Sequence, residues 1–154
     1  YRVHLKAITS SGNEATDEYT VIAYPRSAPS EETRTVSREG NLCSFERIVP
    51  AEIVENEPFK VQVIIKTLAP VQVIQWEDTT WFPGFRLKQE PMGLWTMVDA
   101  GHRISLEYDV ELWQEVETEE VYMTGEVKCN KGGFGNSEVL ELRSDLEIFT
   151  SDDT

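Results

Sequence analysis

The architecture of this chain is best inferred from one segment, Ile104-Ser105-Leu106-Glu107-Tyr108-Asp109-Val110. Apolar or aromatic side chains occupy every second position of this segment, and the positions between them are polar or charged. Successive side chains of a β-strand point to opposite faces. This alternation therefore predicts a strand with one face in a core and the other in water.

At least five other segments repeat the two-residue period. The strands expected from position 42 onward are 42–49, 59–66, 71–77, 86–89, 94–98, 104–110, 121–129 and 140–148. Alternation, in place of continuous apolar runs, indicates antiparallel sheets. About 110 residues with this strand spacing predict an all-β fold, an Ig-like antiparallel β-sandwich of seven to eight strands. A small barrel is the alternative.

Turn-forming residues connect these strands. The sequence Asp99-Ala100-Gly101 predicts a hairpin turn that leads into strand 104–110. The glycine-rich residues 130–136 predict a hairpin loop. Pro91 and Gly93 are expected to separate strands 86–89 and 94–98.

The N-terminal residues differ in composition from the main domain. Strand-like residues 1–8 and 19–24 surround a turn-rich segment and predict a β-hairpin appendage. The expected organisation is a hairpin over residues 1–24, a linker over 25–41, the sandwich over 42–150 and a polar end over 151–154. Within the linker, Thr33 to Val36 can add a short edge strand. Because Tyr1 already lies in a strand-like segment, we expect a piece of a longer polypeptide.

Composition narrows the classes of function. The net charge is −14 and the sequence pI about 4.5, which opposes binding to nucleic acid and to anionic membrane surfaces. No apolar run approaches the roughly 20 residues of a membrane-spanning helix. Hydrophobic residues make up 40% and charged residues 27%, as is typical of a globular domain.

The first strand and its turn carry a resemblance. Tyr1-Arg2-Val3-His4-Leu5-Lys6-Ala7-Ile8, with the turn residues that follow, resembles the closing hairpin of polycystic-kidney-disease-type or fibronectin-type Ig-like modules. The resemblance implies that residues 1–24 are the tail of a preceding module.

The main domain carries a second resemblance. Glu46-Arg47-Ile48-Val49-Pro50 and the alternating strand after it resemble the opening of the conserved repeat modules of bacterial and archaeal cell-surface proteins. Residues 74–85, 106–112 and 122–127 are similar to later elements of that family. Those modules sit in tandem in exported proteins and act as spacers, stalks or adhesion elements without catalytic residues. The resemblance implies a non-catalytic, extracellular or cell-surface module. Its partners would be proteins or glycans at the cell surface and neighbouring modules of the same chain.

Two cysteines, Cys43 and Cys129, are expected to point inward. Cys43 shares its face with Phe45 and Val49, and Cys129 shares its face with Val127. Either a disulfide bond between sheets or strands, or two buried free thiols, fits this placement.

Candidates for catalysis or metal binding are few. His4 and His102 are both expected at the surface, and no spacing of His and Cys predicts a zinc site. No cofactor is expected, apart from a calcium ion for which Glu77 and Asp78 are the candidate ligands. An enzyme, with His102 in a cleft beside carboxylates or a serine, is the most distant of three hypotheses.

Aromatic residues suggest an alternative function. Trp76 ends an apolar strand and is expected in the core, whereas Trp81 and Phe82 precede a Pro-Gly turn and Trp113 follows a strand. Exposed rings of this kind stack on sugars or anchor a protein partner, and the other interpretation is that they fold back over the sandwich. A carbohydrate-binding module that uses Trp81, Phe82 and Trp113 is therefore the second hypothesis.

Overall fold

The computed structural model describes residues 2–8, 14–20, 28–79, 85–87, 90–112, 120–133 and 135–149, and the chain forms two compact units. The first unit, residues 1–27 with 151–154, contains the antiparallel strands β1 (Arg2–Ile8) and β2 (Glu14–Thr20). The predicted N-terminal hairpin is confirmed, but its second strand begins earlier than position 19. The register runs from Ile8 opposite Glu14 to Arg2 opposite Thr20. Residues 21–24 lie outside the described residues.

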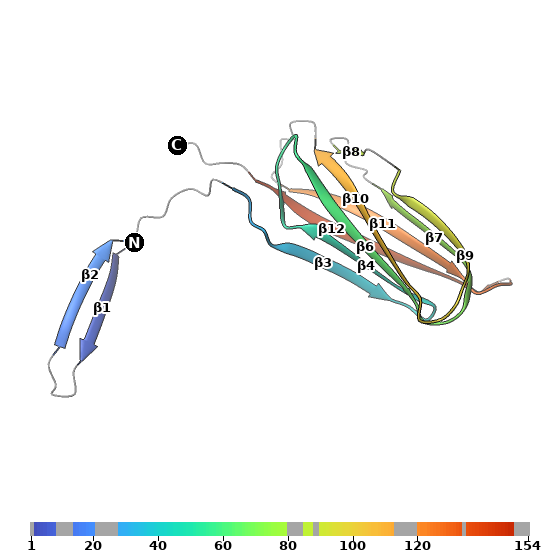
Figure 1. The fold of residues 1–154 in the computed structure, drawn as a ribbon, viewed down its shortest axis with the longest axis horizontal. Helices are drawn as coiled ribbons and strands as arrows, with labels where there is room; N and C mark the ends of the chain where they lie inside the picture. The colour runs from blue at the N-terminus through green and yellow to red at the C-terminus, as the bar shows by residue number, and fades with distance from the viewer. Residues whose placement is uncertain are drawn as a thin grey trace. The chain divides into compact units, whose positions relative to one another are not determined.

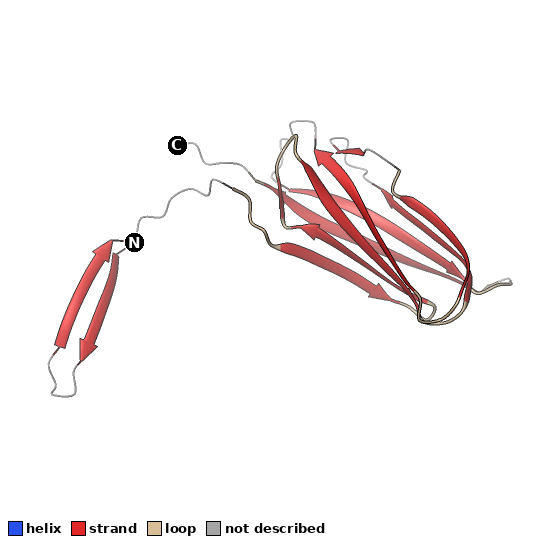
Figure 2. Ribbon diagram, in the orientation of Figure 1, coloured by secondary structure: helices blue, strands red, loops and turns tan. Residues whose placement is uncertain are grey.

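The second unit, residues 28–150, consists of two five-stranded sheets (Figures 1 and 2). The first sheet has the order β3 (Thr33–Glu39), β4 (Cys43–Pro50), β6 (Pro58–Thr67), β10 (Arg103–Leu112) and β8 (Phe85–Leu87). The second has the order β5 (Glu52–Ile53), β12 (Ser137–Ile148), β11 (Glu120–Asn130), β7 (Val71–Thr79) and β9 (Met92–Val98). All neighbours are antiparallel except β5 and β12. The predicted all-β sandwich is confirmed.

The strand order is consistent with an Ig-like sandwich. Strands β4, β6 and β10 occupy the places of strands A, B and E, and β12, β11, β7 and β9 occupy those of G, F, C and C′. The described residues contain ten sandwich strands in place of the expected seven to eight. Among these residues, no helix is long and apolar enough to cross a membrane.

The edge strand that the sequence allowed at Thr33 to Val36, within the predicted linker, is confirmed and is longer than expected, because β3 spans Thr33–Glu39. β3 pairs along its whole length with β4, from Thr33 opposite Pro50 to Glu39 opposite Ser44. The sandwich therefore begins near residue 28 and not at 42. The polar composition of 25–41 was misleading because an edge strand exposes one side to water and packs only a few side chains, here Val36, against the core.

A carboxylate holds the turn between β3 and β4. Glu138 on β12 accepts hydrogen bonds from the backbone N–H groups of Asn41, of Leu42 at 2.9 Å and of Cys43 at 3.1 Å. This side chain satisfies backbone donors that would otherwise lack partners at the turn.

The connection between β9 and β10 differs from the hairpin turn predicted at residues 99–101. Gly101 donates its N–H to the carbonyl of Thr67 at 2.8 Å, and His102 donates to the Thr67 hydroxyl at 2.9 Å. The two strands do not pair with each other, because β9 pairs with β7 and both sides of β10 are occupied by β6 and β8. The turn at 99–101 thus crosses between sheets, and the predicted hairpin is wrong. Gly93, expected between strands, lies inside β9.

The predicted hairpin loop between β11 and β12 is confirmed. Asn130 pairs with Ser137, and the described residues between them, 131–133, 135 and 136, belong to the loop. Gly132, Gly133 and Gly135 have φ angles of 113°, 85° and 79°, which side chains with a Cβ rarely adopt.

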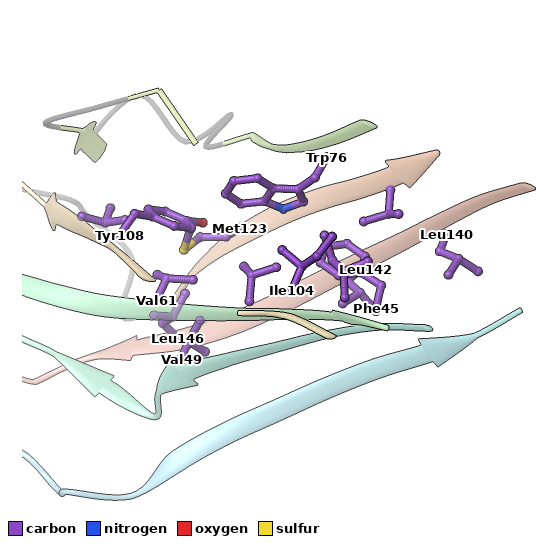
Figure 3. Packing of buried hydrophobic residues seen from close by; sticks show 14 of the residues in the cluster. Phe45, Val49, Val61, Trp76, Ile104, Tyr108, Met123, Leu140, Leu142 and Leu146 are labelled. Carbon is purple, nitrogen blue, oxygen red and sulfur yellow. The ribbon is translucent and has the colours of Figure 1, made fainter. Parts of the chain in front are cut away.

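The core lies between the two sheets and follows the predicted alternation (Figure 3). On β10, Ile104, Tyr108 and Val110 are buried, and on β12 the same holds for Leu140, Leu142, Leu146 and Ile148. Burying a side chain of this size stabilises the fold by about 1.5–3 kcal/mol. The confirmed core position of Trp76 follows from the same parity.

Candidate functional site

The interior contains one covalent link between the sheets. Cys43 on β4 and Cys129 on β11 form a disulfide bond, and both side chains are buried. Of the two alternatives that the sequence left open, the structure has the bridge. A cross-link over 86 residues stabilises a fold by about 4–5 kcal/mol in the chain-entropy model.

The interior also contains a charged side chain that the alternation places on the core face of β4. Arg47 lies between Phe45 and Val49 on that face and is 0% exposed. Its Nε donates to the Ser144 hydroxyl at 2.8 Å, and its Nη2 donates to the carbonyls of Met123 at 2.9 Å and Leu142 at 3.3 Å. The guanidinium of β4 is thus bound to β11 and β12 of the opposite sheet.

Asp78 on β7 supplies the negative charge. Its Oδ1 lies 3.2 Å from Nη1 of Arg47, which is the distance of an ion pair although the two atoms lack the alignment of a hydrogen bond. Trp76 Nε1 donates to the same oxygen at 3.0 Å, and the Tyr108 hydroxyl donates to Oδ2. We call Arg47, Trp76, Asp78, Tyr108 and Ser144 the buried polar cluster.

The aromatic members of the buried polar cluster contact each other. The ring centroids of Trp76 and Tyr108 are 5.8 Å apart with an interplanar angle of 51°. Figure 3 shows both rings near Met123, in the space between the sheets. Each ring therefore packs in the apolar core while its polar atom reaches Asp78.

Gly125 provides the space that the ion pair needs. It is the register partner of Asp78 on β11. A Cβ atom at this position would lie 2.5 Å from Arg47 Nη1 and still closer to Asp78 Oδ1. Any residue other than glycine would therefore displace the ion pair.

Burial governs the protonation of the cluster. Removal from water raises the pKa of Asp78 above its ordinary value, and the charge of Arg47 with the donors Tyr108 and Trp76 offsets part of that effect. Burial, together with the neighbouring charge of Asp78, also raises the pKa of Tyr108. Both acids therefore hold their protons more tightly in the folded chain than in the unfolded one.

The buried polar cluster can join strands but cannot reach a substrate. Its five side chains come from β4, β7, β10 and β12, and each is at most 5% exposed. Sequence reasoning missed it, although one signal was present. Arg47 falls on the inward parity of its strand, and a buried arginine requires an acidic or carbonyl partner. Arg47, Asp78, Tyr108 and Gly125 belong to the four segments 46–50, 74–85, 106–112 and 122–127 named above, and they lie together at the buried polar cluster.

The predicted calcium ligands do not come together. Glu77 is exposed on the outer face of β7, whereas Asp78 is buried and faces Arg47. Neighbouring residues of a strand point to opposite faces, so the two carboxylates cannot bind one ion. Among the residues that the structure describes, no group of three or more His, Cys, Asp or Glu side chains could hold a metal ion.

The remaining candidates divide into two groups. His102 is exposed at the turn before β10, as predicted, and its backbone contacts Thr67. Trp81, Phe82 and Trp113 lie outside the described residues, so carbohydrate binding through them stays a prediction.

Comparison with known proteins adds no assignment. No protein-family model matches the chain, and a search of curated proteins finds no match. The resemblance to cell-surface repeat modules stays a prediction that depends on the motifs alone.

Proposed function

We propose that the chain is a non-catalytic Ig-like module of a larger extracellular or cell-surface protein, acting as a spacer, adhesion or protein-interaction element. The buried polar cluster is the observation that carries this proposal. Its charged and polar side chains are used to join the two sheets and have no access to solvent. A module whose task is to keep its shape needs such links and needs no catalytic cleft.

The disulfide bond supports the location. Disulfide bonds persist mainly in oxidising compartments, which include the cell exterior. The bond between Cys43 and Cys129 is buried and is compatible with that environment. The charge of −14 favours solubility in a crowded, exposed setting.

The location can be tested on intact cells of the source organism. Cells are treated with a membrane-impermeant amine-reactive label, and the protein is recovered with an antibody raised against residues 28–150. We expect label on the protein before lysis and resistance of the cysteines to alkylation until a reductant is added. Labelling that requires lysis, together with two alkylatable thiols, would contradict the proposal.

A further inference from the structure

The sheets have four edges, and one differs from the others. Among the described residues, β5 has two residues and β8 has three, and β3 carries charged side chains at Arg34, Arg38 and Glu39. Short or charged edge strands discourage pairing with other chains. β9 is the fourth edge, and its seven residues include no charged side chain and no proline. Met97 has a φ of 54°, which regular strand residues do not adopt, so the regular part of this edge without charge or proline is residues 92–96.

The free backbone groups of β9 follow from its pairing with β7. Asp78 donates its N–H to the carbonyl of Pro91 at 2.9 Å, so these two residues form a hydrogen-bonded pair. Bonded and non-bonded pairs alternate along an antiparallel ladder. The N–H and C=O groups of Leu94 and Thr96 and the C=O of Met92 therefore face away from β7, at the edge of the sheet, whereas the N–H of Met92 donates to the carbonyl of Glu90 at 2.9 Å.

The outer face next to this edge is apolar at the rim and charged behind it. Met92 is 54% exposed and Leu94 is 62% exposed. Their neighbours on β7 are Glu77 and Gln75, followed by Glu126 and Lys128 on β11. A shallow hollow on this face is lined by all six of these side chains. Its rim is suited to aliphatic groups. On its floor Lys128 lies 3.3 Å from Glu126, so Glu77 is the carboxylate that suits a further cation.

The inner side of the same edge is apolar. Trp95 is partly buried against the core, and its ring lies so close to Gly93 that a Cβ there would be 2.9 Å from Cζ3. A strand added beside β9 would place alternate side chains against this ring and the core margin. Apolar residues fit these positions.

We infer that the β9 edge binds an extended strand of a partner protein in which apolar residues alternate with lysine or arginine. The apolar residues lie beside Trp95, and the aliphatic stems of the basic residues cover Met92 and Leu94. Glu77 is two strand spacings away, about 9.6 Å, which an extended lysine and a glutamate can bridge together. This inference deepens the proposed function and rests on its interaction role.

Charge complementarity selects this occupant over a second copy of the chain. Each copy carries −14, so two copies repel each other at long range, and β9 brings no cation to the acidic residues of the other copy. A basic strand supplies a cation to Glu77, whereas Glu126 already pairs with Lys128 at 3.3 Å, and the strand gains on-rate from the same field.

The probe is a synthetic peptide that alternates valine with lysine, and a valine–glutamate peptide is its control. Binding to the full chain is measured by fluorescence anisotropy and by NMR shifts. We expect binding of the lysine peptide, with shifts at β9 and β7.

Thr96→Pro removes an outward N–H without breaking the β7 ladder, and Leu94→Lys repels the peptide. Each should weaken binding at least about tenfold. Glu77→Gln should weaken it about two- to fivefold, and Glu57→Gln, with the same charge change in the exposed turn before β6 of the other sheet, should leave it unchanged.

Leu94→Lys keeps the test informative if Thr96→Pro fails to fold, because Leu94 is exposed. Equal binding of both peptides, binding that survives Leu94→Lys, or no binding at millimolar peptide would overturn the inference. Self-association in sedimentation equilibrium that Thr96→Pro abolishes would overturn it too, because the occupant would then be a second copy. None of these results touches the proposed location, which surface labelling tests separately.

Discussion

Ion pairs of the same chemistry lie in two different surroundings on this sandwich. Arg47 and Asp78 are 3.2 Å apart with both side chains 0% exposed, and Arg34 and Glu147 are 3.0 Å apart with side chains 39% and 50% exposed. The exposed pair gains little, since water and salt screen it and both side chains lose freedom. The buried pair has no alternative partner in water. The two distances are nearly equal, so burial and not distance decides how much each ion pair contributes to stability.

The largest expected effect is the loss of one buried partner. Arg47→Met leaves the Asp78 carboxyl buried without its cation, and we expect a loss of about 3–5 kcal/mol in the free energy of unfolding. Urea denaturation followed by tryptophan fluorescence measures the change.

The double variant Arg47→Met/Asp78→Leu is the matched control. Replacing both partners with apolar side chains avoids an unpaired charge, so it should cost less than Arg47→Met alone. A double variant that is less stable than either single variant would contradict the view that desolvation dominates at this site.

Tyr108→Phe removes one donor from the Asp78 carboxyl and keeps the ring. We expect a loss of about 1.5–3 kcal/mol at pH 7, the range for a hydrogen bond to a charged group. The ring contact with Trp76 remains, so near-ultraviolet circular dichroism should be largely retained. A loss below about 0.5 kcal/mol would show that Trp76 and Arg47 satisfy Asp78 without the phenol.

The same residue predicts a pH dependence. The folded-state pKa of Tyr108 is raised above the unfolded value of 10.0, so its stabilising contribution is complete below pH 10 and is lost as the pH rises further. Urea denaturation at pH 9, 10 and 11 should show a steeper decline for the original chain than for Tyr108→Phe. Parallel declines would refute the assignment.

Gly125→Ala tests the space beside the ion pair. The added Cβ would overlap Asp78 Oδ1 and approach Arg47 Nη1, and we expect a loss of about 1–3 kcal/mol from overpacking. Gly101→Ala is unsuitable as a control because its φ is 77°. Val127→Ala on the same strand removes buried volume where Gly125→Ala adds it. It should lower stability without changing the loss of stability between pH 9 and 11.

Glu147→Ala gives the smallest expected effect. It removes the exposed partner of Arg34, and we expect a change within about 1 kcal/mol that vanishes in 1 M salt. Thermal denaturation at low and high salt measures it. A loss of unfolding free energy as large as that of Arg47→Met would show that burial does not separate the two ion pairs.

The alternation of side chains was readable because it is local. Parity along β6, β10, β11 and β12 predicted which residues are buried, and it also placed Cys43 and Cys129 inside. The same rule applied to β4 places Arg47 inside. A buried charge is unfavourable without a partner, so the sequence alone provided no reason to accept this position before Asp78 was found beside it. The Gly-rich loop was predictable for the same reason, since its backbone angles depend only on nearby residues.

Pairing between distant strands was not readable in this way. Each strand's period says which face is apolar, but it does not say that β9 pairs with β7 and crosses to β10, or that the edge strand expected at Thr33 to Val36 extends to Glu39. The ion pair between Arg47 and Asp78, and the open edge at β9, exist only once the two sheets are stacked. The direction of a side chain depends on consecutive peptide units, so the sequence alone determined which residues face the core. Contacts between strands and the identity of the exposed edges depend on how the two sheets stack, so only the tertiary structure decided them.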